Sequence, residues 1–101
     1  MSDRMDSIWD ALRFARSASR HRISKRDITH VIVNYSVRFE QAPPPGGPAS
    51  RSTRIVYLGE DLHGRRLEVM AVLGTDRELI VIHAMPLRRK YLALYPEEDA
   101  G

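Results

Sequence analysis

Three apolar segments in the second half of the chain constrain its fold more than any other feature. They span 53–59, 66–73 and 78–84, with turn residues between them at 61–64 (DLHG) and 74–77 (GTDR), and the last is rich in β-branched residues. Consecutive strands joined by turns this short pair antiparallel. The last segment contains ELIVIHA, which is apolar on both faces and is therefore expected to be a central strand.

These strands form a predicted antiparallel meander, and segments whose apolar residues have helical spacing lie on both sides of it. Apolar residues at i, i+3, i+4 and i+7 predict helices over 5–20, 25–34 and 87–95, and Ser24 is the expected N-cap of the second. A further short strand is predicted at 36–40. The expected architecture is an α+β domain with a small antiparallel β-sheet of about four strands, two N-terminal helices and a C-terminal helix.

The length of 101 residues fits a single domain over 1–101, with its core at 5–96. Residues 41–52 contain PPPGGP and predict an exposed loop, and 97–101 form an acidic tail. The chain has no Cys, which excludes disulfides and cysteine nucleophiles. The absence of both an 18-residue apolar run and a signal-like start predicts a cytoplasmic protein without membrane contact.

The distribution of charge favours a polyanionic partner. Acidic residues gather at the two ends, so residues 11–96 hold 15 basic and 7 acidic side chains, a net charge of +8. Of the 16 basic residues, 14 are Arg, whose planar guanidinium binds phosphate through two parallel hydrogen bonds. This composition is typical of proteins that bind nucleic acid, although genomic bias alone also produces an excess of Arg over Lys.

A cluster of basic residues joins the first two predicted helices. We expect it either to bind phosphate groups of a nucleic acid or to be a solvated turn whose Arg residues cap the first helix. Its members are Arg16, Arg20, His21, Arg22, Lys25 and Arg26.

Two strands of the meander carry a second candidate set. Alternation along the strands allows Arg54, Glu68 and either Arg65 or Arg66 to share one sheet face, and it places Arg66 and Glu68 together if 66–73 is a strand. Arginine beside a carboxylate suits phosphodiester cleavage, with the arginine neutralising the phosphate and the carboxylate moving a proton. The alternative is a cross-strand ion pair on a solvated face.

The third candidate cluster lies where the last strand meets the last helix. His83 ends the strand, and the helix opens with Arg88, Arg89, Lys90 and Tyr91. Cations at a helix start oppose the helix dipole and so suggest an anionic ligand. The alternative is a half-buried strand histidine beside solvated arginines. The four His residues show no i, i+4 or HxH spacing, so no metal site is predicted.

In their order along the chain, these motifs resemble small toxins of the BrnT type in the RelE/ParE superfamily. The carrying segments are RHRIS after the first helix, RIVYLG, GRRLEV and VIHAMPLRRKYLALY, over residues 8–96. The chain departs from the family at Arg22, where the family has Gly, at His83, where it has a small or polar residue, and in a longer loop.

The resemblance implies a helical start, a central antiparallel sheet and a C-terminal helix. It also implies a ribonuclease directed at mRNA or at the ribosome and neutralised by an antitoxin encoded beside it. Carried over by position, His21 matches the histidine after the first helix, Arg54 the Arg that leads the first strand motif, and Arg66 the Arg of the next. Arg88 and Arg89 fall in the terminal Arg motif.

The expected function is therefore that of a metal-independent endoribonuclease toxin. Arg54, Arg66 and Arg88 or Arg89 would hold the scissile phosphate. The RNA 2′-hydroxyl would be the nucleophile, so no cofactor is expected. Candidates for the base or acid are His21, His83 and Glu68. Two alternatives remain at this point: a non-catalytic module of the same fold that binds nucleic acid or protein, and a structural protein with no nucleic-acid role.

Overall fold

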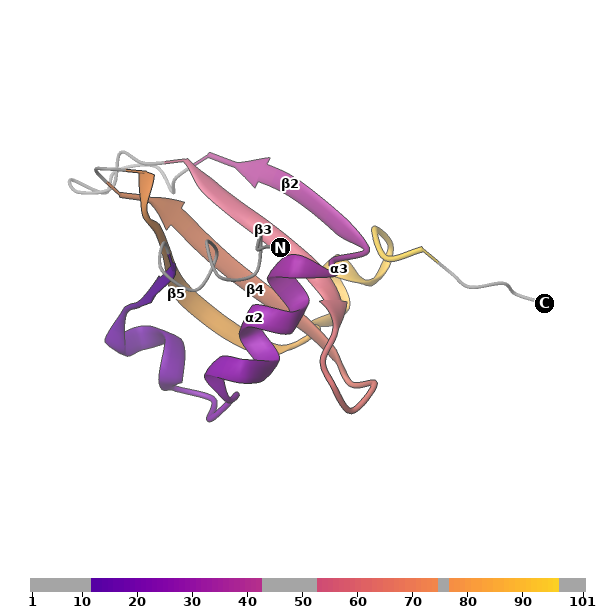
Figure 1. Ribbon diagram of the computed structural model, residues 1–101. Helices are drawn as coiled ribbons and strands as arrows, with labels where there is room; N and C mark the ends of the chain where they lie inside the picture. The colour runs from indigo at the N-terminus through magenta and orange to yellow at the C-terminus, as the bar shows by residue number, and fades with distance from the viewer. Residues whose placement is uncertain (1–11, 43–52, 75–76, 97–101) are drawn as a thin grey trace, which may run out of the picture.

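Five strands form one sheet in the computed structural model, which describes residues 12–42, 53–74 and 77–96 (Figure 1). The elements in chain order are β1 (Leu12–Phe14), the 3-10 helix η1 (Arg16–Ser19), α2 (Lys25–Val33), β2 (Val37–Gln41), β3 (Arg54–Glu60), β4 (Arg66–Leu73), β5 (Leu79–Pro86) and α3 (Arg89–Leu92). The predicted loop at 43–52 and the acidic tail at 97–101 lie outside the described residues.

The strand order is β1-β5-β4-β3-β2. Strands β2 to β5 pair antiparallel in sequence order, which confirms the predicted meander to within two residues at each strand end. β1 was not predicted, and it pairs parallel with β5. The sheet is therefore mixed, and β5 is an interior strand with neighbours on both sides.

The prediction of two N-terminal helices is wrong. Of the predicted helix at 5–20, residues 5–11 lie outside the described residues, Leu12–Phe14 form β1, and only the short η1 is helical. Pairing with β5 accompanies the difference, because the Ala15 N–H donates to the carbonyl of Val81 at 2.9 Å and so takes no part in a helical ladder. The Ser17 hydroxyl donates to the carbonyl of Ile82 on β5 at 2.7 Å, and that of Ser19 donates to the carbonyl of Arg16 at 2.9 Å.

The predicted fold class is thereby corrected in both its sheet and its helices. The sheet has five strands in mixed orientation instead of about four antiparallel strands. Within the described segments, α2 is the one helix longer than four residues. The predicted C-terminal helix at 87–95 reduces to α3 followed by turns, in which Leu94 and Tyr95 each donate to a carbonyl three residues earlier.

The second predicted helix is confirmed as α2, with Ser24 as its N-cap. The Ser24 hydroxyl accepts a hydrogen bond from the backbone N–H of Asp27 at 3.0 Å, as the capping rule expects. It also donates to the Asp27 carboxylate at 3.0 Å. The apolar face of α2 lies across one face of the sheet (Figure 1) and buries Ile28, Val31 and Ile32 against it.

Each face of the sheet has its own apolar cluster. The face under α2 holds the larger one, to which alternate residues of β3, β4 and β5 contribute, including Tyr57, Val69 and Val81. The opposite face holds Val56 and Leu58 packed against Tyr91 of α3. Gly59 lies on the α2 face, where a Cβ would meet the Tyr35 Cα at 3.2 Å, so this position admits the close approach of the α2–β2 connection.

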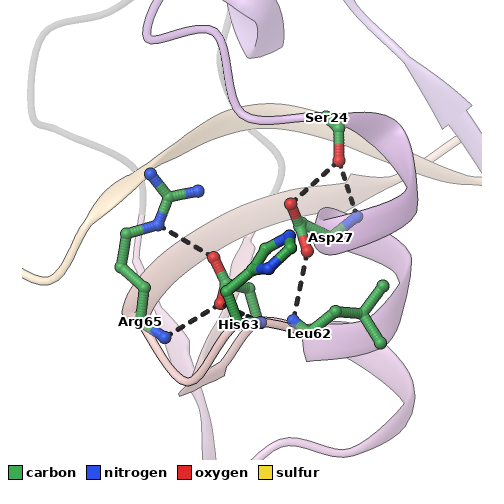
Figure 2. A network of polar contacts seen from close by, with 6 residues as sticks. Ser24, Asp27, Leu62, His63 and Arg65 are labelled. Atoms are coloured by element: carbon green, nitrogen blue, oxygen red, sulfur yellow. Dashed lines mark hydrogen bonds and ion pairs between the residues drawn. The ribbon is translucent and has the colours of Figure 1, made fainter.

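The β3–β4 turn is attached to the N-terminal end of α2 by a network of polar contacts (Figure 2). The Asp27 carboxylate accepts from the backbone N–H of Leu62 at 3.1 Å. Asp61 accepts from the backbone N–H groups of His63 and Arg65 at 2.8 and 2.9 Å, and from Nε of Arg65 at 2.8 Å. Burial raises the pKa of Asp61, but these hydrogen bonds and the Arg65 charge hold it below its usual value.

Within residues 12–42, 53–74 and 77–96, the structure contains no helix with the length and apolar character needed to span a bilayer.

Candidate functional site

Glu68 is the centre of the candidate site. Alternation along β4 turns its neighbours Leu67 and Val69 toward α2, and it turns Glu68 toward the opposite face of the sheet. Only 1% of Glu68 is exposed, yet it is not an isolated charge. Its Oε1 accepts from the backbone N–H of Arg88 at 2.9 Å, and its Oε2 accepts from Nε of Arg88 at 2.8 Å and is also contacted by Nη2.

These contacts keep Glu68 ionised in the folded protein. Burial alone raises the pKa of this carboxyl, but the hydrogen bonds from Arg88 and His83 and the Arg88 charge outweigh it, so the pKa lies below its usual value. The same side-chain hydrogen bond raises the pKa of Arg88. A carboxylate held this way is a poor proton acceptor, because the groups around it stabilise its ionised form.

His83 shares the Glu68 carboxylate with Arg88. Its Nε2 lies 3.0 Å from Oε2 of Glu68. An ionised carboxylate can only accept, so Nε2 carries a proton, and Nδ1 is the ring nitrogen that does not face Glu68. The side chain of His83 remains 26% exposed. The pair therefore offers an imidazole that a carboxylate orients, and no hydrogen bond to its second nitrogen is found among the described residues.

A bulge in β5 turns His83 toward Glu68. Val81 is opposite Ala71 and His83 is opposite Met70, so Ile82 is an extra residue between two consecutive β4 positions. Val81 and Ala84 both belong to the apolar cluster under α2, although they are three residues apart. Strict alternation from Val81 would turn His83 toward α2 as well, and the extra residue reverses its direction.

His21 approaches His83 from another part of the chain. It follows η1, which lies along β5, and its ring centroid is 6.2 Å from that of His83 with the ring planes at 74°. The sequence placed these histidines in separate clusters, and the fold brings them together. The next residue, Arg22, has φ of 59°, in the left-handed region where glycine is favoured.

Arg54 and Arg66 share a sheet face with Glu68 but do not meet. Arg54 is opposite Val72 and Arg66 is opposite Glu60, so six strand positions, about 20 Å, separate them. Arg66 lies over the Tyr95 ring, 4.6 Å from its centroid. Nη1 of Arg54 is buried and has no hydrogen-bond partner among the residues that the structure describes. The strand register therefore does not bring the two side chains together.

The remaining candidate residues are divided between surface and core. All five cationic side chains of the basic cluster are exposed, namely Arg16, Arg20, Arg22, Lys25 and Arg26. Arg89 is exposed too, whereas Tyr91 is 4% exposed, packs against Phe39 and accepts a hydrogen bond from Gln41. An open hollow lined by Arg16, Ser17 and Arg20 lies beside η1.

Sequence reasoning missed the connection between Arg88 and Glu68. It placed the two residues in separate clusters, and no local pattern links side chains twenty residues apart. The one available signal was the position of Arg88 before a helix, where a cation is unfavourable unless an anion accompanies it. The anion is Glu68.

Comparison with protein-family models, with curated proteins and with solved structures gave no match to this chain. Within the part of the chain that the structure describes, no three His, Asp or Glu side chains gather closely enough to hold a metal ion.

Proposed function

We propose that this chain is a metal-independent endoribonuclease and the toxin of a type II toxin–antitoxin pair, acting on mRNA in the cytoplasm. The observation that carries the proposal is the convergence of His83, held by Glu68, with His21 and Arg88. Two imidazoles and a guanidinium within one small region are the groups that RNA cleavage through its 2′-hydroxyl requires.

In the proposed reaction, Nδ1 of His83 takes the proton of a ribose 2′-hydroxyl. The 2′-oxygen attacks the adjacent phosphorus, and the bond from phosphorus to the 5′-oxygen breaks. His21, in its protonated form, gives its proton to that leaving oxygen. The products are a 2′,3′-cyclic phosphate and a 5′-hydroxyl, so protons and electrons balance without a cofactor.

Arg88 and Glu68 have supporting roles in this scheme. Glu68 is a positioning residue, because both its oxygens already accept hydrogen bonds and its pKa is lowered. Arg88 uses Nε and Nη2 on Glu68, and its remaining guanidinium N–H groups are available for charge that develops on the phosphate. The exposed basic cluster beside η1 supplies contacts for flanking phosphates.

The backbone at Arg22 supports the family resemblance behind the toxin assignment. The toxins that the chain resembles have Gly after the histidine that His21 matches. The chain adopts a left-handed conformation at this position even though it carries Arg. Gly accommodates this conformation without strain, so the backbone at Arg22 is consistent with aligning His21 with the histidine of those toxins.

The proposal is tested by incubating the purified protein with an RNA oligonucleotide in EDTA, beside the same sequence made as DNA. We expect RNA to be cleaved to cyclic-phosphate ends and DNA to be left intact. His83→Gln and His21→Gln should each slow cleavage by about 100-fold or more. His63→Gln, in the exposed β3–β4 turn, is the matched control and should cleave at the wild-type rate.

The same experiment separates the catalytic proposal from the non-catalytic alternative. RNA that is bound but never cut, by a protein with a normal thermal transition, indicates a binding module of the same fold. For the toxin assignment, expression should arrest bacterial growth, and co-expression of the adjacent reading frame should relieve the arrest. Failure of that gene product to bind the protein would contradict the toxin–antitoxin pairing.

A further inference from the structure

β2 forms one outer edge of the sheet (Figure 1). Its one strand neighbour in the described segments is β3, so the other side of its backbone carries N–H and C=O groups that none of the described strands satisfies. The opposite edge, β1, has only three residues. A five-residue edge strand is a template on which another strand can pair.

The residues of β2 alternate between two environments. Val37, Phe39 and Gln41 are half-buried on the face that carries Tyr91, while Arg38 and Glu40 are exposed on the other face. One positive and one negative side chain therefore flank Phe39 symmetrically. A strand with this pattern is complementary to a second copy of itself when the two run antiparallel.

We propose that two copies of this chain pair through β2 in an antiparallel register centred on Phe39, which joins their five-stranded sheets into one continuous sheet about a twofold axis. In this register Arg38 of each copy faces Glu40 of the other, giving two cross-strand ion pairs. Phe39 faces Phe39 of the second copy, and Val37 faces Gln41. The interface is isologous, so it closes at a dimer.

Charge selects this register over its neighbours. A parallel pairing places Arg38 against Arg38 and Glu40 against Glu40. Antiparallel pairings centred on Arg38 or on Glu40 each bring two like charges directly opposite, which destabilises a strand pair. Shifting by a single residue sets the half-buried face of one copy against the exposed face of the other. The Phe39-centred register avoids all of these conflicts.

The dimer edge is remote from the site of the proposed function. His83 lies on β5, and β4 and β3 separate β5 from β2. The pairing leaves His21 and His83 uncovered in both copies. A result against the dimer would therefore not contradict the ribonuclease proposal, and a result against the ribonuclease would not contradict the dimer. A five-residue strand pairing is small, so we expect a dissociation constant of about 10 to 100 μM.

Sedimentation equilibrium of the full chain, from micromolar to near-millimolar concentration, tests the proposal. The wild type should shift from monomer to dimer across this range. Arg38→Glu and Glu40→Arg alone should each weaken the dimer by about tenfold or more, because two ion pairs become two like-charge pairs. The double variant Arg38→Glu/Glu40→Arg has the wild-type composition and should restore the dimer.

A control variant and a second measurement test whether β2 itself forms the interface. Arg26→Glu, on the exposed side of α2, changes the net charge as Arg38→Glu does and should dimerise like the wild type. Hydrogen exchange should show β2 amides becoming more protected as the wild-type concentration rises. A wild type that stays monomeric throughout, or single variants that dimerise as tightly as the wild type, would overturn the proposal.

Discussion

Nε2 of His83 lies 3.0 Å from Oε2 of Glu68, although the two residues are not opposite each other in the sheet. Glu68 is opposite Met85 and His83 is opposite Met70, so the contact is a diagonal one between neighbouring strands. It depends on the extra residue at Ile82, which turns His83 away from α2. The bulge directs His83 to one oxygen of Glu68, and the backbone N–H of Arg88 donates to the other oxygen.

Replacing Glu68 should weaken the fold in a pH-dependent way. Because its folded pKa is lowered from the usual 4.5, Glu68 contributes stability that is present above that value and is lost as the pH falls through the folded pKa. Glu68→Gln should therefore lower the free energy of unfolding by about 2 kcal/mol at neutral pH. Urea unfolding at neutral and acidic pH measures this difference, which should shrink in acid.

The exposed residue Glu60, at the end of β3, provides the control. Glu60→Gln should change the free energy of unfolding by less than about 0.5 kcal/mol at either pH. A Glu68→Gln deficit that is equally large in acid would show that the ionised form of Glu68 contributes nothing to stability.

Arg22→Gly should stabilise the protein. A non-glycine residue in the left-handed region costs about 1 to 2 kcal/mol, and glycine adds about 0.5 to 1 kcal/mol of unfolded-state entropy, so the net gain is about 0.5 kcal/mol. Thermal and urea unfolding measure the gain. The matched control is Arg20→Gly, where φ is −53° and glycine should be destabilising. Equal effects at the two positions would contradict the explanation.

Ser24→Ala should remove the N-cap of α2 and lower the free energy of unfolding by about 1 kcal/mol. The loss extends to Asp27, whose carboxylate accepts from the Ser24 hydroxyl and also holds the β3–β4 turn at Leu62. Hydrogen exchange should therefore show faster exchange at Leu62 as well as in the first turn of α2. Ser19→Ala, at an exposed serine of η1, should leave both measurements near wild type.

Arg54 and Arg66 should act as separate phosphate contacts. They lie about 20 Å apart on one sheet face, so their contributions to RNA affinity should add in the Arg54→Ala/Arg66→Ala double variant. Each single variant should also reduce the slope of log K against log salt by about one. Binding is measured with a 2′-deoxy-substituted oligonucleotide, which the proposed chemistry cannot cleave. A double variant no weaker than either single one would mean that both side chains contact one phosphate.

Short-range patterns were sufficient where neighbouring residues carry the signal. The β4 segment, the Ser24 cap and the turn at Asp61 all follow from residues within a few positions of each other, and the structure confirms them. The helix predicted over 5–20 failed in its described part, where Leu12 and Phe14 are sheltered and Arg13 between them is exposed, as in a strand. Hydrogen bonds from Ala15 and Ser17 to carbonyls of β5, more than sixty residues away, decide between the two in the described part.

The sequence by itself determined the meander, the helix α2 and the set of His, Arg and Glu residues available for chemistry. Period-two alternation placed Arg54, Arg66 and Glu68 on one face because that rule is local. Only the tertiary structure decided which of these residues meet. Strand register separates Arg54 from Arg66, and the Ile82 bulge turns His83 toward Glu68. The path of η1 along β5 brings His21 close to His83. No local sequence pattern predicts this contact, because it depends on pairing between segments far apart in the chain.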